Sequence, residues 1–222
     1  MTLVDETVRQ MLRDRFVVGW HNIWREDYVG QSHGYRRDQL AVGTTNGAGG
    51  RNMQIFVLAP DLTVVHALPG FWHPEDFAHE LRLAEGLFSL WQDGQLSRQQ
   101  KDDMFRAVQL AECRSRCEAT VARSGWQHFD AHAERVRARS EPRDTLACVS
   151  LPADLGMVTL LKPLNVLAHE RMAERPFLPF AEFDVEGFVD YGRPYYDNNA
   201  GRGTKGAVLP KAPKSKPAYH WL

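Results

Sequence analysis

Two neighbouring stretches decide the fold: NMQIFVLAPD at residues 52–61 and VVHALPG at residues 64–70. Both are rich in β-branched and aromatic residues, which predicts strands over Met53–Leu58 and Thr63–Leu68. The connection between them contains Pro60, whose ring fixes φ and favours a tight turn. The short connection therefore predicts an antiparallel hairpin.

Helices are predicted on both sides of the hairpin. Upstream, apolar residues recur at helical spacing between Val4 and Leu12, which predicts a helix over Asp5–Arg13. Downstream, Pro74 opens a second helix, and the two acids that follow it suit the positive end of the helix dipole. The predicted buried stripe of this second helix is Phe77, Leu81, Ala84, Phe88 and Trp91.

Two further features precede the hairpin. Phe16–Trp20 is short, β-branched and aromatic, which predicts a buried strand. Gly43–Gly50 is glycine-rich, but a phosphate-binding loop should follow a strand, open a helix and often carry a lysine. This run precedes a strand and has no lysine, so a plain connection is favoured.

A helical stretch follows the α/β part of the chain. Ser97 and Gln100 have the spacing of a capping box, which predicts a helix that runs to about Arg123. A further helix is expected after the break at Ser124–Gly125.

From about residue 144 the chain is predicted to be irregular, with short strands at Thr145–Leu151 and Met157–Leu161. Phe180–Glu186 alternates apolar and acidic residues, which suits an edge strand or an extended packing segment. The last 22 residues carry lysine and arginine but no acid, and their prolines favour an extended basic arm.

The order of these elements resembles the part of a thioredoxin-like domain that follows its redox motif. The resemblance is carried by the two hairpin stretches, by Pro74–Phe77 after them, and by the opening residues Thr2–Val18. It covers residues 1 to 92. It implies an α/β fold, a thioredoxin-like mixed sheet flanked by helices, here with a helical and irregular C-terminal extension.

The resemblance and the composition shifts together give an expected organisation. A thioredoxin-like domain covers residues 1–93, and a helical segment covers residues 94–140. An irregular segment over residues 141–200 packs its short strands on the core. An extended basic tail covers residues 201–222.

Several features of the family are missing. Its CxxC motif does not occur in this sequence and would lie before Met1, together with the strand that precedes it. Gly50-Arg51-Asn52 stands where the family has a cis proline. Because the missing strand is central, we expect Thr145–Leu151, Met157–Leu161 or a partner chain to fill its place. The alternative is that Phe16–Trp20 is itself the central strand of a small sheet.

The bulk composition excludes several classes of protein. The 222 residues are 43% hydrophobic and 25% charged, with a formal net charge of -1, which argues against a nucleic-acid binder and a disordered chain. Neither a secretory signal nor an apolar run of about 20 residues is present. The three cysteines do not suggest a disulfide scaffold. We therefore expect a cytoplasmic protein without a cofactor or a membrane span.

Two pairs of residues are candidate chemical groups. Cys113 and Cys117 lie four apart on a predicted helix, where their parallel Cβ vectors suit a disulfide poorly and a zinc site would need more ligands. Buried structural thiols are favoured over a redox pair. His128 and His132 share a helix face, as in zinc-binding helices, but the sequence offers no third ligand, so no metal is expected.

The basic arm is the feature that most suggests a partner. Its aromatic and apolar end supplies anchors of the kind found at interfaces, although a solvated tail is the alternative. The expected partner-binding residues are Lys211, Lys214, Lys216, Tyr219, Trp221 and Leu222.

These observations favour a non-catalytic thioredoxin-like binding or assembly protein, acting as a subunit or adaptor in a complex or as a homo-oligomer. The alternative is a thiol-disulfide oxidoreductase that uses Cys113 and Cys117 or a motif upstream of Met1. A third hypothesis is a metal-dependent enzyme that uses His128 and His132. The sequence leaves enzymatic activity open but leans against it.

Overall fold

The fold combines helices with short antiparallel strands in a mixed α/β arrangement. A computed structural model of the chain describes residues 2–22, 53–115, 118–123, 149–150, 160–161, 163–185, 188 and 220–221. None of the helices in these ranges is long and apolar enough to cross a membrane.

The predicted hairpin is confirmed. Strand β2 (Gln54–Leu58) pairs antiparallel with β3 (Val64–Pro69), in a register that sets Phe56 opposite Ala67. The backbone N–H of Thr63 donates to the Asp61 carboxylate at 3.0 Å, which fixes the turn. Every residue of β3 is buried, so this strand is the centre of the core.

The helices on either side of the hairpin are also confirmed. A 3-10 turn, η1 (Thr2–Val4), leads into α1 (Glu6–Arg15), whose N-cap Asp5 accepts a hydrogen bond from a backbone N–H of the first turn. Helix α2 (Pro74–Gln92) starts at the predicted proline. Its buried face contains Phe77, Leu81 and Ala84 as predicted, together with Asp76, Ala78, Glu80 and Leu87. The other two residues of the predicted stripe, Phe88 and Trp91, are only half-buried.

The third helix begins as predicted but ends early. The capping box of Ser97 and Gln100 is present at the start of α3 (Arg98–Arg114). The helix then stops at Ser115 instead of continuing to Arg123, and a separate short helix, α4 (Glu118–Arg123), follows.

The expectation of an irregular segment after residue 141 was wrong in one important place. Residues Leu164–Ala173 form helix α6, which packs against α3 and β3. Eight of its ten residues are buried, so it has no polar face and no apolar stripe for a sequence pattern to reveal. Beyond it, η3 (Phe180–Glu182) leads to buried Phe183 and Val185, which makes this stretch a packing segment.

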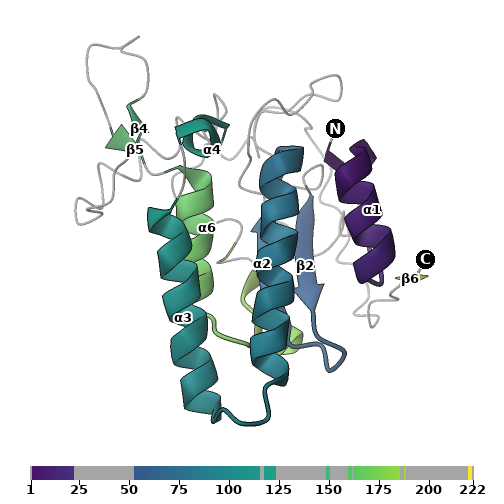
Figure 1. Cartoon of the computed structure of the whole chain (residues 1–222), viewed down its shortest axis with the longest axis vertical. Helices are drawn as coiled ribbons and strands as arrows, with labels where there is room; N and C mark the ends of the chain where they lie inside the picture. The colour runs from purple at the N-terminus through teal and green to yellow at the C-terminus, as the bar shows by residue number, and fades with distance from the viewer. Residues whose placement is uncertain are drawn as a thin grey trace, which may run out of the picture.

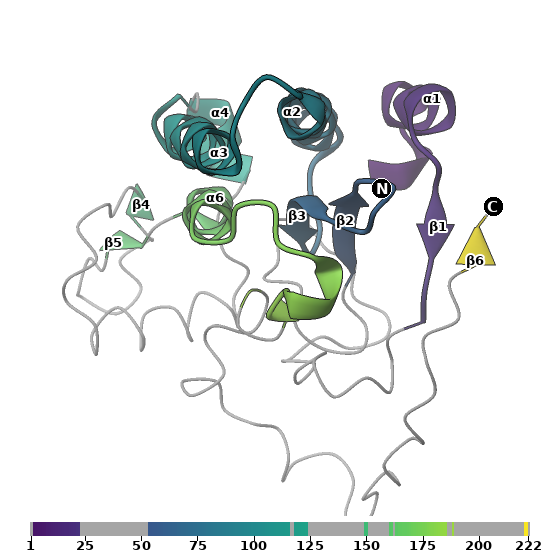
Figure 2. The ribbon, with the colours of Figure 1, turned by 90° about the horizontal axis from the view of Figure 1, so that it is seen from below.

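The elements form two layers (Figure 2). Helices α3, α2 and α1 lie side by side in one layer, and α6, β3 and β2 lie beneath them in the other. Figure 1 shows the same order from α3 and α6 across α2 to α1. The hairpin is therefore covered by α2, while α6 continues the lower layer beneath α3.

The prediction of a buried strand over Phe16–Trp20 was wrong. Only β1 (Gly19–Trp20) is a strand, and it pairs antiparallel with β6 (His220–Trp221) from the other end of the chain. Val17 is 78% exposed and Trp20 is 57% exposed. Apolar composition predicted the extended backbone here but not its position at the margin of the fold.

In the residues that the structure describes, neither of the two segments expected to replace the missing central strand pairs with the hairpin. Strand β4 (Val149–Ser150) pairs with β5 (Leu160–Leu161), and the two form a sheet separate from the hairpin. The Gly43–Gly50 loop, the helix expected after Gly125 and most of the basic arm lie outside the described residues.

Replacing Gly70 should destabilise the fold. Gly70 directly follows β3 with a φ of 72°, in the left-handed region that costs other residues roughly 1–2 kcal/mol. We expect Gly70→Ala to lower the free energy of unfolding by about that amount in chemical denaturation. Gly86→Ala is the matched control, because Gly86 lies within α2 with no atom within 4 Å of an added Cβ. The control should stabilise by about 0.5–1 kcal/mol, and a shift of both variants in the same direction would contradict this view.

Candidate functional site

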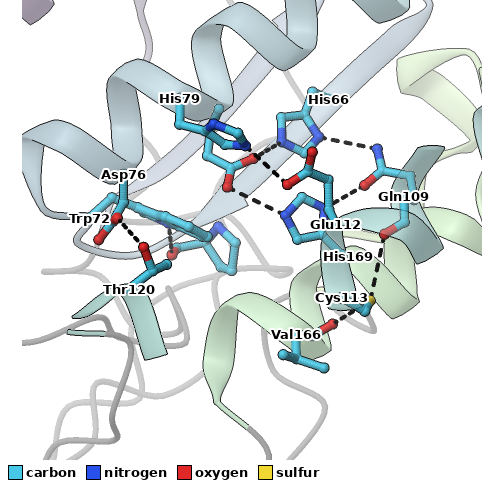
Figure 3. A network of polar contacts seen from close by, with 12 residues as sticks. His66, Trp72, Asp76, His79, Gln109, Glu112, Cys113, Thr120, Val166 and His169 are labelled. Atoms are coloured by element: carbon cyan, nitrogen blue, oxygen red, sulfur yellow. Dashed lines mark hydrogen bonds and ion pairs between the residues drawn. The ribbon is translucent and has the colours of Figure 1, made fainter. Parts of the chain in front are cut away.

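Four polar residues from four different elements meet inside the core (Figure 3). His66 comes from β3, Glu80 from α2, Gln109 from α3 and His169 from α6. His66 and His169 are each 1% exposed, and Glu80 and Gln109 are completely buried. We call these four residues the buried polar cluster.

Local structure forces each of these side chains inward. Glu80 lies three residues after Phe77 and one before Leu81, on the face of α2 that packs on the core. Gln109 lies one turn after buried Phe105 on α3. His66 has no solvent-facing side available, because β3 is buried throughout its length. His169 is likewise enclosed on all sides, within the buried helix α6.

The two carboxylate oxygens of Glu80 contact one histidine each. His66 Nε2 lies 3.0 Å from Oε2, and His169 Nε2 lies 3.3 Å from Oε1. The two imidazole rings stack with their centroids 5.7 Å apart. Glu80 is therefore held between the histidines and is shielded from water.

Gln109 makes the two histidines different from each other. Its Oε1, which only accepts, lies 2.6 Å from His169 Nδ1, while its Nε2, which only donates, lies 3.5 Å from His66 Nδ1. His169 thus donates from both ring nitrogens and is an imidazolium. His66 instead faces the carboxylate with Nε2 and the amide nitrogen of Gln109 with Nδ1, so the two rings have different surroundings.

The pKa of Glu80 reflects this pairing. Burial alone would raise it, but the charge of His169, the hydrogen bonds from His169 and His66, and the charge of His66 together hold the pKa well below its usual value of 4.5. The carboxylate is ionised although no water reaches it, because its histidine partners replace the solvent.

Two neighbouring contacts fix the helices around the cluster. Asp76, one turn before Glu80 on α2, accepts from Thr120 at 3.1 Å and from two nitrogens of Arg123 at 2.8 and 3.0 Å, which ties α4 to α2. On the more exposed side, His79 contacts Glu112 of α3 at 3.0 Å.

Cys113 is the one candidate redox residue whose side chain the structure describes. It is half-buried near the end of α3, and its Sγ lies 3.5 Å from the carbonyl oxygen of Gln109 and 3.7 Å from that of Val166 (Figure 3). Its predicted partner Cys117 lies outside the described residues, as do His128 and His132. Cys113 therefore lies beside the buried polar cluster but is not part of it.

The partner-binding prediction is only partly covered by the structure. The backbone of Trp221 pairs with Gly19 of β1. Lys211, Lys214, Lys216, Tyr219 and Leu222 lie outside the described ranges.

Sequence reasoning missed the buried polar cluster. One signal was available: Glu80 occupies a position of the apolar stripe of α2, between Phe77 and Ala84, where a charge needs a partner. Nothing comparable marks His169, because the helix that carries it was not predicted.

The cluster includes a set of groups able to hold a metal ion. His66, Glu80 and His169 each offer one ligand atom, and these atoms lie within 4.8 Å of one another.

A scan against protein-family models, a search of curated proteins and a search of solved structures each found no match for this chain.

Truncating Glu80 should be strongly destabilising. Glu80→Ala leaves His169 buried without its counter-charge, and we expect the free energy of unfolding to fall by about 3–5 kcal/mol in chemical denaturation. His79→Ala is the matched control, because it removes an adjacent but more exposed ion pair and should cost only about 0–1 kcal/mol. Equal, small effects for the two variants would show that the cluster does not stabilise the core.

Low pH should lower the stability of the metal-free protein by protonating Glu80. Because the pKa of Glu80 is lower in the folded than in the unfolded chain, its contribution is complete above pH 4.5 and is lost as the pH falls toward the folded pKa. Unfolding measured at a series of pH values should show this loss in the wild type and a shallower one in Glu80→Gln. Asp103→Asn removes an exposed carboxylate and should keep the wild-type profile, and identical profiles for all three proteins would contradict the assignment.

Proposed function

We propose that this chain is a non-catalytic, thioredoxin-like binding or assembly protein that acts as a subunit or adaptor in a complex. The order of α1, β2, β3 and α2 supports the thioredoxin-like part of the proposal. In that order an antiparallel hairpin leads through a glycine into a helix that covers it.

The position of Cys113 is the main observation in support of a non-catalytic role. A thiol-disulfide enzyme attacks with a thiolate, which is favoured by positive charge or a helix N-terminus. Cys113 lies instead at the negative end of α3 and faces two carbonyl oxygens, which accept from a thiol and repel a thiolate. This environment suits a structural thiol.

The margin of the fold supports a binding role. The first twenty residues expose several large apolar side chains, which is typical of interaction surfaces. The exposed residues are Leu3, Val4, Val17, Val18 and Trp20. Strand β1, among them, already pairs with an extended segment, β6, in antiparallel register. Exchange of this strand between copies, with β6 of one chain pairing with β1 of a second, is the binding mode that we propose.

Sedimentation of the purified full chain tests this proposal. We expect the average mass to rise with protein concentration, and we expect deletion of residues 217–222 to abolish the rise because β6 is removed. Val17→Asp should weaken association as well, because it places a charge on the exposed apolar margin. Arg106→Ala, on the exposed surface of α3, is the control and should associate like the wild type. A monomeric mass for the full chain at every concentration would overturn the proposed assembly.

The oxidoreductase alternative is tested on the same protein. Reduction of insulin with dithiothreitol should proceed at the buffer rate with the wild type and with Cys113→Ser/Cys117→Ser. A faster rate for the wild type that disappears in the double variant, but not when the third cysteine is replaced in Cys148→Ser, would favour the enzyme.

A further inference from the structure

We propose that His66, Glu80 and His169 form a binding site for one Zn²⁺ ion. The site lies where β3, α2 and α6 meet, and it goes beyond the binding role proposed above. It also differs from the helix pair His128 and His132, for which the sequence offered no third ligand.

The spacing of the ligand atoms fits a single ion. One atom from each residue lies within 4.8 Å of the others. Ligands bound to zinc at about 2.0–2.1 Å in a tetrahedral arrangement stand roughly 3.3 Å from one another. Glu80 reaches His66 with Oε2 at 3.0 Å and His169 with Oε1 at 3.3 Å, so an ion held by one of these oxygens would draw the ligand atoms closer together than the 4.8 Å within which they now lie.

The chemistry of the donors suits zinc and also iron(II), and it disfavours hard and soft ions. Two imidazole nitrogens and one carboxylate form a three-ligand set that zinc uses in proteins, with a fourth position left for water. Calcium and magnesium require more oxygen ligands than one carboxylate supplies. Copper(I) prefers sulfur, and the nearby Sγ of Cys113 is directed at backbone carbonyls.

An outer partner is already in place for one ligand. A metal-bound histidine usually donates its other ring N–H to an oxygen, which fixes the ring and its tautomer. Gln109 Oε1 lies 2.6 Å from His169 Nδ1 and accepts such a hydrogen bond, so that Nε2 is directed at Glu80 and the ion. His66 would give up its longer 3.5 Å contact with the Gln109 amide nitrogen.

Burial determines the role of the ion. The three ligand residues are at most 1% exposed, so the bound metal and the one water that completes its coordination would be enclosed together, away from bulk solvent. It would connect three segments that are distant in sequence, since Glu80 lies 14 residues from His66 and 89 from His169. Such an ion cross-links the core, and its binding free energy adds to the free energy of folding.

The experiment uses the untagged full chain. The protein is unfolded in denaturant with a chelator, and is then refolded alone, with one equivalent of Zn²⁺, or with one equivalent of Co²⁺ as a spectroscopic probe. After gel filtration we expect about one ion per chain, a higher melting temperature than for the metal-free protein, and the visible absorption bands of four-coordinate cobalt. Refolded wild-type protein that retains no stoichiometric ion, or melts at the same temperature with and without zinc, would overturn the proposal.

Variants locate the ion. His66→Gln and His169→Gln should each lose the bound ion and the cobalt bands, with folding checked by circular dichroism. His79→Gln, adjacent to Glu80 but facing Glu112, should bind like the wild type. His128→Gln/His132→Gln should also keep the ion. If either ligand variant fails to fold, this double variant decides the location, because loss of the ion from it would place the metal on the other pair and overturn the proposal.

Discussion

Burying the Glu80 carboxylate is the constraint on which the rest of the described core depends. A charge of this kind loses several kcal/mol of hydration in a protein interior unless partners replace the water. The partners are supplied by β3 and α6, which come from distant parts of the chain. The hairpin, α2 and α6 must therefore all be in place before the Glu80 carboxylate has its hydrogen bonds to both histidines. An arrangement that lacked any one of them would leave the Glu80 carboxylate buried without the partners that replace its water.

The hairpin depends on the same assembly. Two antiparallel strands are marginal on their own in water. Here α2 covers one side of β2 and β3, and the segment around η3 closes the other side (Figure 2). Phe56 of β2 meets Phe180 and Phe183 edge to face, at centroid distances of 5.1 and 5.5 Å. The chain thus builds a compact core around a small sheet by adding late segments of its sequence to an early hairpin.

The parts of the fold with a local signal were predictable. Pro60 and the strand composition located the hairpin, and Ser97 with Gln100 located the start of α3, because turns and helix caps are decided by a few neighbouring residues. Helix α6 has no such signal, since it is buried on nearly every side and its sequence shows no amphipathic period.

The candidate site was hidden for the same reason. His66 lies in a stretch that otherwise predicts only a strand, and the partner that explains Glu80 lies on the unpredicted helix. The exposure of Phe16–Trp20 was not predictable either, because apolar composition indicates an extended strand without telling which neighbours cover it. Long-range packing decides both features.

The hydrogen bonds of the Gln109 amide affect how a proton and a metal ion compete for the histidine nitrogens. With protons alone, every nitrogen and oxygen named in the cluster has a partner. An ion bound to Nε2 of both rings would displace the protons there and replace the Nε2 hydrogen bonds to Glu80 with bonds to the metal. His66 would then carry its proton on Nδ1, which faces a donor, and would lose the longest contact in the cluster. A lost hydrogen bond costs about 1 kcal/mol, whereas zinc binding contributes about 10–16 kcal/mol in zinc-finger peptides at neutral pH. The loss is too small to exclude the ion. Because the ligand atoms are sealed in the folded chain, the availability of zinc during folding would decide which state forms.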